Sequence, residues 1–257
     1  MPGTTLQLLE KYMVTRQVEG NYAKLKDFSI RWGADLFGVA NISSVKKDFA
    51  VSNSLLEHFD SAIVLAVRLS AAILQDIDDA PTKLYFHHYR SANMFLDQLT
   101  FRISNFIQDL GYKALPIAAS QIVDWEKQSA HLSHKKIGYL AGLGWIGRNN
   151  LLVNSRFGSQ FRIVSVLTDM AIKHDKPQKE DCGNCRLCMI RCPAKAIKEK
   201  SARFDHQACF ALLKEFQKKR IVDQYICGIC VKACKGKGVK NGTLNINAGK
   251  KGSKRSS

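Results

Sequence analysis

Eight cysteines lie between residues 182 and 234, and the residues before them contain none. Four of these cysteines fall in the segment CGNCRLCMIRCP, which has the spacing C-x2-C-x2-C-x3-C-P. Three thiolates at two-residue gaps can wrap one face of a 4Fe-4S cubane, and the fourth, followed by proline, is directed towards a second cluster. The run therefore predicts another set of cysteines. Its own four are Cys182, Cys185, Cys188 and Cys192.

The predicted second set is present. It consists of one isolated cysteine and three more in the segment CGICVKAC. Two complete sets of four ligands result if each cysteine is used once and the last cysteine of each run crosses over to the other cluster. We expect the first cluster at Cys182, Cys185, Cys188 and Cys234, and the second at Cys192, Cys209, Cys227 and Cys230.

Two structural zinc sites with four cysteines each are the alternative, because C-x-x-C pairs are common zinc ligands. Zinc usually takes two cysteines from each pair, whereas this run offers three in close succession and then a Cys-Pro. The spacing therefore favours two 4Fe-4S clusters. No secretory signal is recognisable, so a disulfide framework is not expected.

The chain has 257 residues, which is enough for one large domain or two modest ones with a buried core. Its hydrophobic content of 46% and charged content of 24% are ordinary for globular proteins and exclude a disordered or fibrous chain. The net charge of +17 is concentrated in residues 171–257, which hold 21 basic and 7 acidic side chains. We therefore expect a polyanionic partner, no membrane partner and a cytoplasmic location.

Hydrophobic periodicity predicts the elements that must position the cysteines. Helices are expected over residues 6–32 and 90–110, and buried strands over residues 61–69 and 160–167. This mixture of helices and strands indicates an α+β domain with helices packed on a sheet. The apolar face of the second helix is expected to carry Phe95, Leu99, Phe106 and Leu110.

The composition divides the chain into three parts. A polar segment over residues 173–181 has the character of a linker between the α+β domain and the cysteines. The last residues are rich in Gly, Asn, Ser and Lys. We expect an α+β cofactor- and substrate-binding domain over residues 1–175, a double-cluster module over 176–236 and a disordered basic tail over 237–257.

The segment AGLGWIGRNN matches G-x-G-x-x-G through Gly142, Gly144 and Gly147. A dinucleotide site needs a strand before this loop and a helix after it, whereas here a helical pattern precedes the loop and an extended run follows. We therefore expect either the close approach of another flat or phosphate-bearing cofactor or a structural turn.

A family resemblance emerges from the order of these features. An α+β domain, a long helix after a Tyr-basic element, the segment AGLGWIGRNNLLVN, the strand SVLTD and a double-cluster module resemble the epoxyqueuosine reductases over roughly residues 20–234. These are cobalamin-dependent iron-sulfur enzymes related to reductive dehalogenases. The resemblance implies a nitroreductase-like mixed sheet domain followed by a bacterial-ferredoxin-like double 4Fe-4S module, in a short form that lacks the family's C-terminal helical-repeat region.

The resemblance also implies a reaction. In the family, the clusters pass single electrons to cobalamin, whose reduced form acts on the epoxide of epoxyqueuosine in tRNA and yields queuosine. We therefore expect an oxidoreductase with two 4Fe-4S clusters and cobalamin, with tRNA as substrate and a flavodoxin or ferredoxin as low-potential electron donor. Expected catalytic residues are Asp124 and His134, and expected cofactor-binding residues are Tyr89, Gly142, Gly144, Trp145, Gly147, Arg148 and Asn149.

His131 and His134 are spaced one turn apart, so both are expected on one side of a helix, where they could donate protons or remain ordinary surface histidines. Two other functions stay open on the sequence. One is a dicluster electron carrier whose N-terminal domain only docks a partner enzyme. The other is an RNA-binding module held together by zinc.

Overall fold

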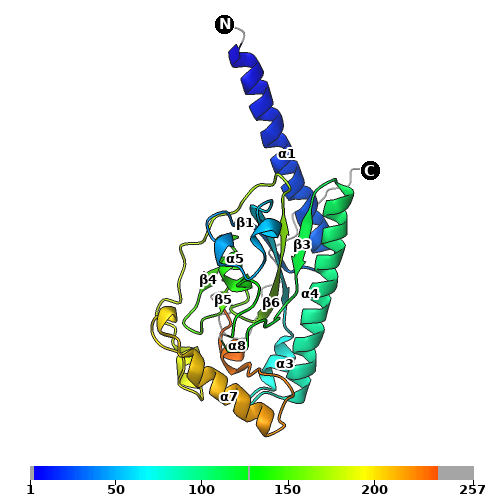
Figure 1. The fold of residues 1–257 in the computed structure, drawn as a ribbon. Helices are drawn as coiled ribbons and strands as arrows, with labels where there is room; N and C mark the ends of the chain where they lie inside the picture. Colours follow the sequence, from blue (N-terminus) through cyan, green and yellow to red (C-terminus); the bar gives the residue numbers. More distant parts are fainter. Residues whose placement is uncertain (1–2, 127, 237–257) are drawn as a thin grey trace, which may run out of the picture.

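A four-stranded antiparallel sheet lies at the centre of the molecule (Figure 1). The computed structural model describes residues 3–126 and 128–236. The α+β class is confirmed, but the mixed sheet expected from the resemblance is wrong, because every strand pair of this sheet is antiparallel. In order across the sheet, the strands are β1 (Leu36–Asn41), β2 (Ser61–Arg68), β6 (Phe161–Thr168) and β3 (Ala114–Ile117).

Strand β2 is buried on both faces, as its continuous apolar sequence predicts. Successive side chains of a strand point to opposite faces, so Ile63 and Leu65 pack into one hydrophobic cluster while Val64 and Ala66 pack into another. The sheet is therefore the middle of three layers.

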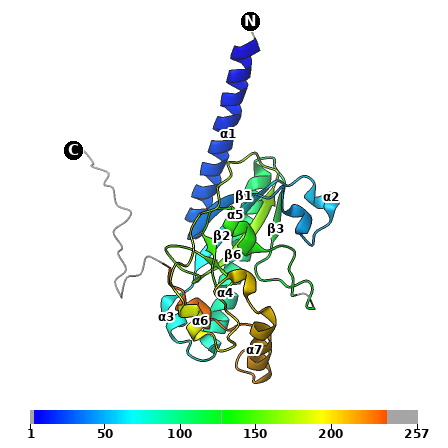
Figure 2. The same ribbon diagram turned by 90° about the vertical axis from the view of Figure 1, so that its left-hand side faces the viewer.

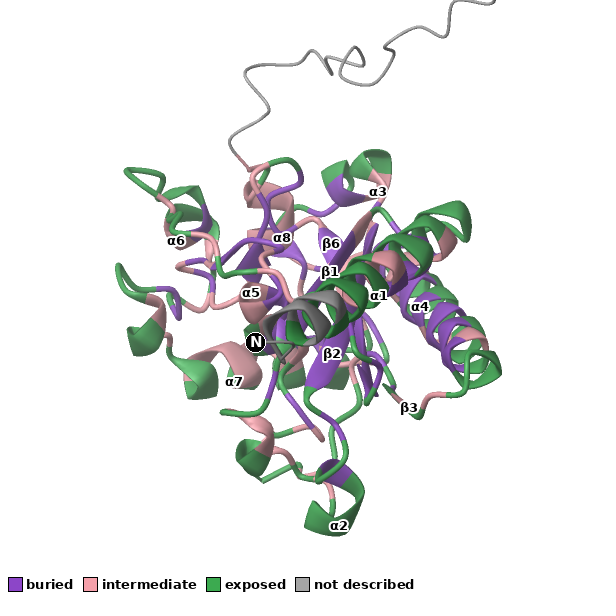
Figure 3. Ribbon diagram, turned by 90° about the horizontal axis from the view of Figure 1, so that it is seen from above, coloured by how far each residue is buried: buried purple, intermediate pink, exposed green. Residues whose placement is uncertain are grey.

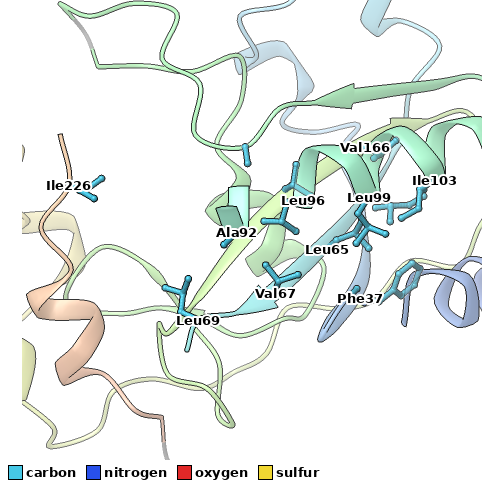
Figure 4. Packing of buried hydrophobic residues seen from close by; sticks show 14 of the residues in the cluster. Phe37, Leu65, Val67, Leu69, Ala92, Leu96, Leu99, Ile103, Val166 and Ile226 are labelled. Atoms are coloured by element: carbon cyan, nitrogen blue, oxygen red, sulfur yellow. The ribbon is translucent and has the colours of Figure 1, made fainter. Parts of the chain in front are cut away.

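Helices α1 (Gly3–Arg31) and α4 (Lys83–Asp109) cover one face of the sheet, and Figure 4 shows α4 packed on β2 and β6. The first part of α1 projects away from the body (Figure 1). Thr82 caps α4 by accepting a hydrogen bond from the backbone N–H of Tyr85.

The predicted apolar face of α4 is only half correct. Leu99 is buried and Phe106 packs partly against the core, whereas Phe95 and Leu110 are exposed. The buried residues lie at helical spacing from Leu99, so they share one side of α4. Figure 3 shows that this side, which faces the sheet, is buried. It is carried by Leu96, Leu99, Ile103 and Ile107.

The opposite face of the sheet carries short elements and the glycine segment. The helical pattern before the glycines and the extended run after them are confirmed. His131 precedes the helix, whose N-cap is Ser133, so the expected pairing of His131 and His134 on one helical face is wrong. The elements are η1 (Lys46–Asp48), α2 (Asn53–Leu56), α5 (His134–Leu140), and a hairpin of β4 (Trp145–Ile146) and β5 (Leu152–Val153).

The cysteine module follows an irregular segment that is firmly attached to the sheet region. Within that segment Asp175 accepts hydrogen bonds from the Val39 backbone and the Tyr22 hydroxyl, and His174 bonds with Ser61. The expected basic tail lies outside the described residues. The remaining helices are α3 (Ala71–Gln75) near the module, and α6 (Leu187–Arg191), η2 (Ser201–Arg203), α7 (His206–Lys218) and α8 (Ile229–Ala233) within it (Figure 2).

No helix in the described part of the chain is both long enough and apolar enough to cross a membrane.

Candidate active site

Four cysteines from both ends of the module line one cavity of about 530 Å³. Helices α6 and α8 pack against each other, which brings the two cysteine runs together. Burial and the three neighbouring thiols raise the pKa of Cys188 to about 11, so the four sulfurs lie close enough to affect one another. This first quartet is Cys182, Cys185, Cys188 and Cys234.

The remaining four cysteines form a second quartet, Cys192, Cys209, Cys227 and Cys230. Burial raises the pKa of the Cys230 thiol, and Cys227, Cys209 and Cys192 add to the shift. Cys188 of the first quartet also contributes, which places the two quartets side by side. The structure thus gathers the cysteines in the two sets that the crossed spacing predicts.

The cavity of the first quartet fits a cubane. It is a partly open pocket with thiols on its walls rather than a point where side chains converge. Among the described residues, no three His, Cys, Asp or Glu side chains form a group that could hold a single metal ion. Thiolates around one tetrahedral zinc ion lie only about 4 Å apart.

Two residues of the glycine segment hold the first quartet in place. The Trp145 indole Nε1 donates a hydrogen bond to Cys182 Sγ at 3.4 Å. Arg148 donates to the backbone carbonyls of Cys185 and Gly183 at 3.0 and 2.9 Å and pairs with Glu199 at 3.0 Å. These side chains therefore fasten the cysteine loop to the hairpin.

The glycines themselves are needed where the backbone passes close to other parts of the chain. A Cβ on Gly144, whose φ is +156°, would meet the Val153 carbonyl oxygen at 1.9 Å. A Cβ on Gly142, whose φ is +68°, would lie 2.6 Å from the Lys176 carbonyl oxygen. This close packing favours a structural turn at both glycines, and their expected role in cofactor binding stays a prediction.

A second cavity of about 210 Å³ lies between the second quartet and the sheet. The buried Tyr85 lines it, and the thiols of Cys227 and Cys230 contribute to the raised pKa of this tyrosine, whose main cause is burial. Val231, the residue after Cys230, lines the same cavity. Its lining contains basic residues and no carboxylate, so it suits an anionic or amide-bearing ligand.

His134 stands on the wall of this cavity at the start of α5. Its Nε2 lies 3.2 Å from the Ala118 carbonyl oxygen and its Nδ1 lies 2.9 Å from Ser165 Oγ. A carbonyl oxygen can only accept, so the ring donates from Nε2 and accepts from the serine hydroxyl at Nδ1. Burial lowers the pKa of His134 to about 4, and the ring is neutral at neutral pH.

Arg162 is a site residue that the sequence reasoning missed. Its guanidinium donates to Asn93 at 3.0 Å, to the Tyr89 hydroxyl at 3.1 Å and to Ser120, and it lies over the Tyr89 ring. Tyr89 thus contacts Arg162 and does not itself line the cavity. The sequence feature that could have revealed it is a single cation within a mostly apolar strand. Such a cation is costly to bury unless it is bound to polar groups.

Lys135 is the other cation that the sequence reasoning missed. Burial lowers its pKa, and its Nζ donates to the Asn150 carbonyl oxygen at 2.8 Å. Asn149, an expected cofactor ligand, is buried beside the first cavity and bonds with Ser159 at 3.1 Å. Asn149 therefore belongs to the neighbourhood of the first quartet.

Asp124 lies in the long loop between β3 and α5, not on the wall of either cavity. It pairs through the backbone with Ser129, and its carboxylate accepts a hydrogen bond from the backbone N–H of Glu126 at 3.0 Å. Ser120, at the start of the same loop, lines the second cavity with a φ of 58°. The expected proton donor is thus on the loop that borders the cavity, and its catalytic role stays a prediction.

Cobalamin does not fit inside the second cavity as it stands. Pockets that enclose drug-sized ligands measure about 300–1,000 Å³, and a corrinoid is larger than such ligands. A space of about 210 Å³ is too small for it.

Comparison with known proteins identifies two groups of similar enzymes. No family model matches the chain. An epoxyqueuosine reductase from Yersinia pestis is 41% identical over 69 residues, which are 27% of this chain and 17% of that protein. The resemblance to epoxyqueuosine reductases is confirmed. A tetrachloroethene reductive dehalogenase from Desulfitobacterium hafniense is 33% identical over 137 residues, which are 51% of this chain and 23% of that protein.

Solved structures of the same two groups share the fold. One is a reductive dehalogenase whose structure suggests a mechanism for B12-dependent dehalogenation. It matches with a TM-score of 0.69 and 18% identity, and the match covers 84% of this chain and 32% of that chain. An epoxyqueuosine reductase with an epoxyqueuosine-modified tRNA-Tyr stem loop matches with a TM-score of 0.58 at 18% identity over 82% of this chain and 64% of its own.

The chain spans only 17% and 23% of the length of the two curated relatives described above. Both relatives are reductases by name.

Proposed function

We propose that this protein is a cytoplasmic iron-sulfur reductase that resembles the epoxyqueuosine reductases. Each cysteine quartet would hold one 4Fe-4S cluster, and the two clusters would supply one-electron transfer next to the second cavity. The substrate that we propose is epoxyqueuosine in tRNA. Reduction of its epoxide to an alkene consumes two electrons and two protons and releases water.

The observation that carries this proposal is the order of the three sites. Cys185 of the first quartet is exposed, Cys188 neighbours Cys230 of the second quartet, and the second quartet lies beside the cavity on the sheet. Electrons can therefore enter at the surface and leave at a polar cavity. An electron carrier that only served a partner enzyme would have no need for a cavity lined by Arg162 and Lys135 at the end of this path.

Cobalamin is the further cofactor that we propose from the resemblance. When bound, it would supply a metal centre of low potential that transfers electrons to the substrate. The second cavity is too small for it as it stands, so its binding requires a wider site than the one described here.

The residues at the cavity divide their roles. His134 ties Ala118 in the loop to Ser165 in β6, so we propose that it positions the loop. Asp124 lies on that loop and is the proton donor that we propose. Arg162 bonds with Tyr89 and fixes Ser120 at the cavity wall, where the charge of Arg162 would favour a phosphate or an oxygen-rich group.

An aromatic and basic surface next to the loop supports an RNA substrate. Trp125 is 55% exposed and stands edge-on to Tyr225 of the module, which in turn stands edge-on to Phe210 of α7. Lys214 lies over the Phe210 ring, and Lys218 is exposed on the same helix. Unstacked bases bind to aromatic rings of this kind, and neighbouring cations contact phosphates.

Metal analysis of anaerobically purified protein is the first test. We expect about eight irons and eight sulfides per chain. Zinc without iron would overturn the proposal in favour of a zinc-stapled module. The second test adds cobalamin and a low-potential reductant and assays epoxyqueuosine-containing tRNA for queuosine. Iron-loaded protein that neither shows corrinoid absorption bands nor forms queuosine would favour the dicluster electron carrier instead.

A further inference from the structure

The surface around the first quartet has two features that the cluster itself does not require. Leu187 is 55% exposed and Ile190 is 76% exposed, although both belong to the short helix α6 that carries Cys188. Leu187 also lines the cavity of the first quartet. Large apolar side chains exposed one helical turn apart can mark a surface that another molecule covers.

Cations surround this apolar patch. Arg191 lines the same cavity, is exposed, and forms no ion pair among the described residues. Lys235 is exposed at the cavity, and Lys232 lines it while donating to backbone carbonyls at the end of α3. The nearby carboxylate of Glu199 is already shared between Arg148 and Arg186. Two carboxylates, Asp78 and Asp181, line the same cavity. Against them stand Arg191, Lys232 and Lys235, so the rim carries a small excess of positive charge.

We propose that Leu187, Ile190 and Arg191 form the docking surface for a small acidic one-electron carrier protein. The apolar pair provides a dry contact beside exposed Cys185, where a carrier can approach the first cluster most closely. The cationic rim attracts and orients a negatively charged partner, since opposite charges at the edge of an interface raise the rate of association. In each encounter the carrier loses one electron and the first cluster gains it, with no bond or proton transferred.

The docking surface is separate from the surface proposed for RNA. The RNA surface involves Trp125, Tyr225 and α7, whereas the docking surface involves α6, and Figures 2 and 3 show α6 and α7 at different places on the module. A carrier bound at α6 could thus deliver electrons while RNA occupies the other surface. The inference rests on the proposed two-cluster function, because docking matters only if the first quartet holds a redox centre.

The experiment compares a protein reductant with a small one on the full, iron-loaded chain. An acidic flavodoxin is the probe, and dithionite is the small reductant. The variants are Ile190→Asp and Arg191→Glu, and the matched controls are Phe101→Ser in the exposed part of α4 and Arg16→Glu on exposed α1. Iron content and visible absorption are measured first, so that only variants with intact clusters are compared.

We expect each docking variant to weaken flavodoxin binding about tenfold, as loss of a central contact does. The bleaching of the cluster by flavodoxin should slow by a similar factor, the bleaching by dithionite should not change, and added salt should weaken binding by the original protein. The inference would be overturned if the docking variants bound flavodoxin as tightly as the wild-type protein does. It would also be overturned if the variants lost tRNA binding but kept flavodoxin binding. Iron-free protein would overturn the proposed function itself.

Discussion

In the sheet region, large apolar side chains fill both faces of the sheet, whereas the cysteine module over residues 176–236 buries few. Four of the module's buried residues pack into the cluster of the sheet region rather than into one of their own. They are Phe216, Val222, Ile226 and Ile229. Helices α6 and α8 have five residues each, and helices this short are not stable on their own.

The difference teaches that the two regions of this chain depend on different sources of stability. The sheet region is stabilised by the removal of apolar surface from water, at about 25 cal/mol per Å². The module has too little of that surface. If its eight thiols hold the two proposed clusters, their ligation would supply much of its stability, as it does in small metal-binding domains. Substitutions in the two regions should therefore have different signatures.

The largest contrast is expected from Cys230→Ser. Loss of one ligand should release the second cluster, lower the iron content from about eight to about four per chain and reduce reductase turnover to background. Iron and sulfide analysis with an activity assay measures this. Full iron content in the variant would contradict the ligand assignment. Circular dichroism should show that the sheet region stays folded.

A substitution in the sheet region should lower stability and leave the iron content unchanged. Leu65 is fully buried in β2, so Leu65→Ala should lower the free energy of unfolding by about 2–5 kcal/mol. Iron content should not change in conditions where the protein remains folded. Denaturant unfolding measures the stability, and Leu84→Ala at a position 55% exposed is the control, with an expected change below about 0.5 kcal/mol. Parallel loss of iron would show that the two regions are not independent.

Gly158 is a point of contact between the regions. Its φ is +59°, and an added Cβ would meet the carbonyl oxygen of Cys234 at 1.9 Å. Gly158→Ala should therefore displace Cys234 and reduce iron occupancy at the first quartet, while the second quartet keeps its cluster. Gly20→Ala is the control, because a Cβ there meets nothing within 4 Å and alanine favours a helix by about 1 kcal/mol. Iron content measured by chemical analysis distinguishes the two variants.

Trp125 lies in a loop of the sheet region and contacts Tyr225 of the module. If the exposed ring stacks on a base, Trp125→Ala should weaken tRNA binding by about 1–3 kcal/mol, or roughly 5- to 150-fold. Filter binding at fixed salt measures the affinity. Trp32→Ala, at another exposed tryptophan, is the control and should bind tRNA normally. An equal effect of both substitutions would contradict the assigned surface.

The last contrast concerns the pH dependence that His134 gives to stability. Its pKa in the folded protein is lowered from 6.5 to about 4, so the folded state binds fewer protons than the unfolded state. The resulting stability is present above pH 6.5 and is lost as the pH falls towards 4. His134→Gln should flatten this part of the pH profile of unfolding. A wild-type slope in the His134 variant would refute the neutral, buried ring.

Sequence reasoning located the regular elements and the grouping of the cysteines because each depends on local spacing. The continuous apolar run of residues 61–69 predicted β2, and the cysteine gaps predicted which thiols share a quartet. The direction of strand pairing is not local: β3 and β6 are far apart in the sequence, and only their packing makes the whole sheet antiparallel. The faces of α4 were also misjudged, because Phe95 is apolar yet exposed.

The candidate active site was predictable only in part for the same reason. His134 was found through its spacing, but its bonds to Ala118 and Ser165 depend on how the loop returns to the sheet. Arg162 was missed because its partners come from a distant helix and loop. Trp145 and Arg148 were expected to bind a cofactor, and the structure shows that both are hydrogen-bonded to the cysteine loop.

The crossed arrangement of the quartets has a consequence for biosynthesis. The first quartet begins with Cys182 but needs Cys234, and the second begins with Cys192 but needs Cys230. On a ribosome neither set of thiols is complete until almost the whole module has been translated, and the two are then completed within a few residues of each other. Metal insertion would therefore follow synthesis of the module, and a chain that stops before Cys230 would have neither complete site to receive it.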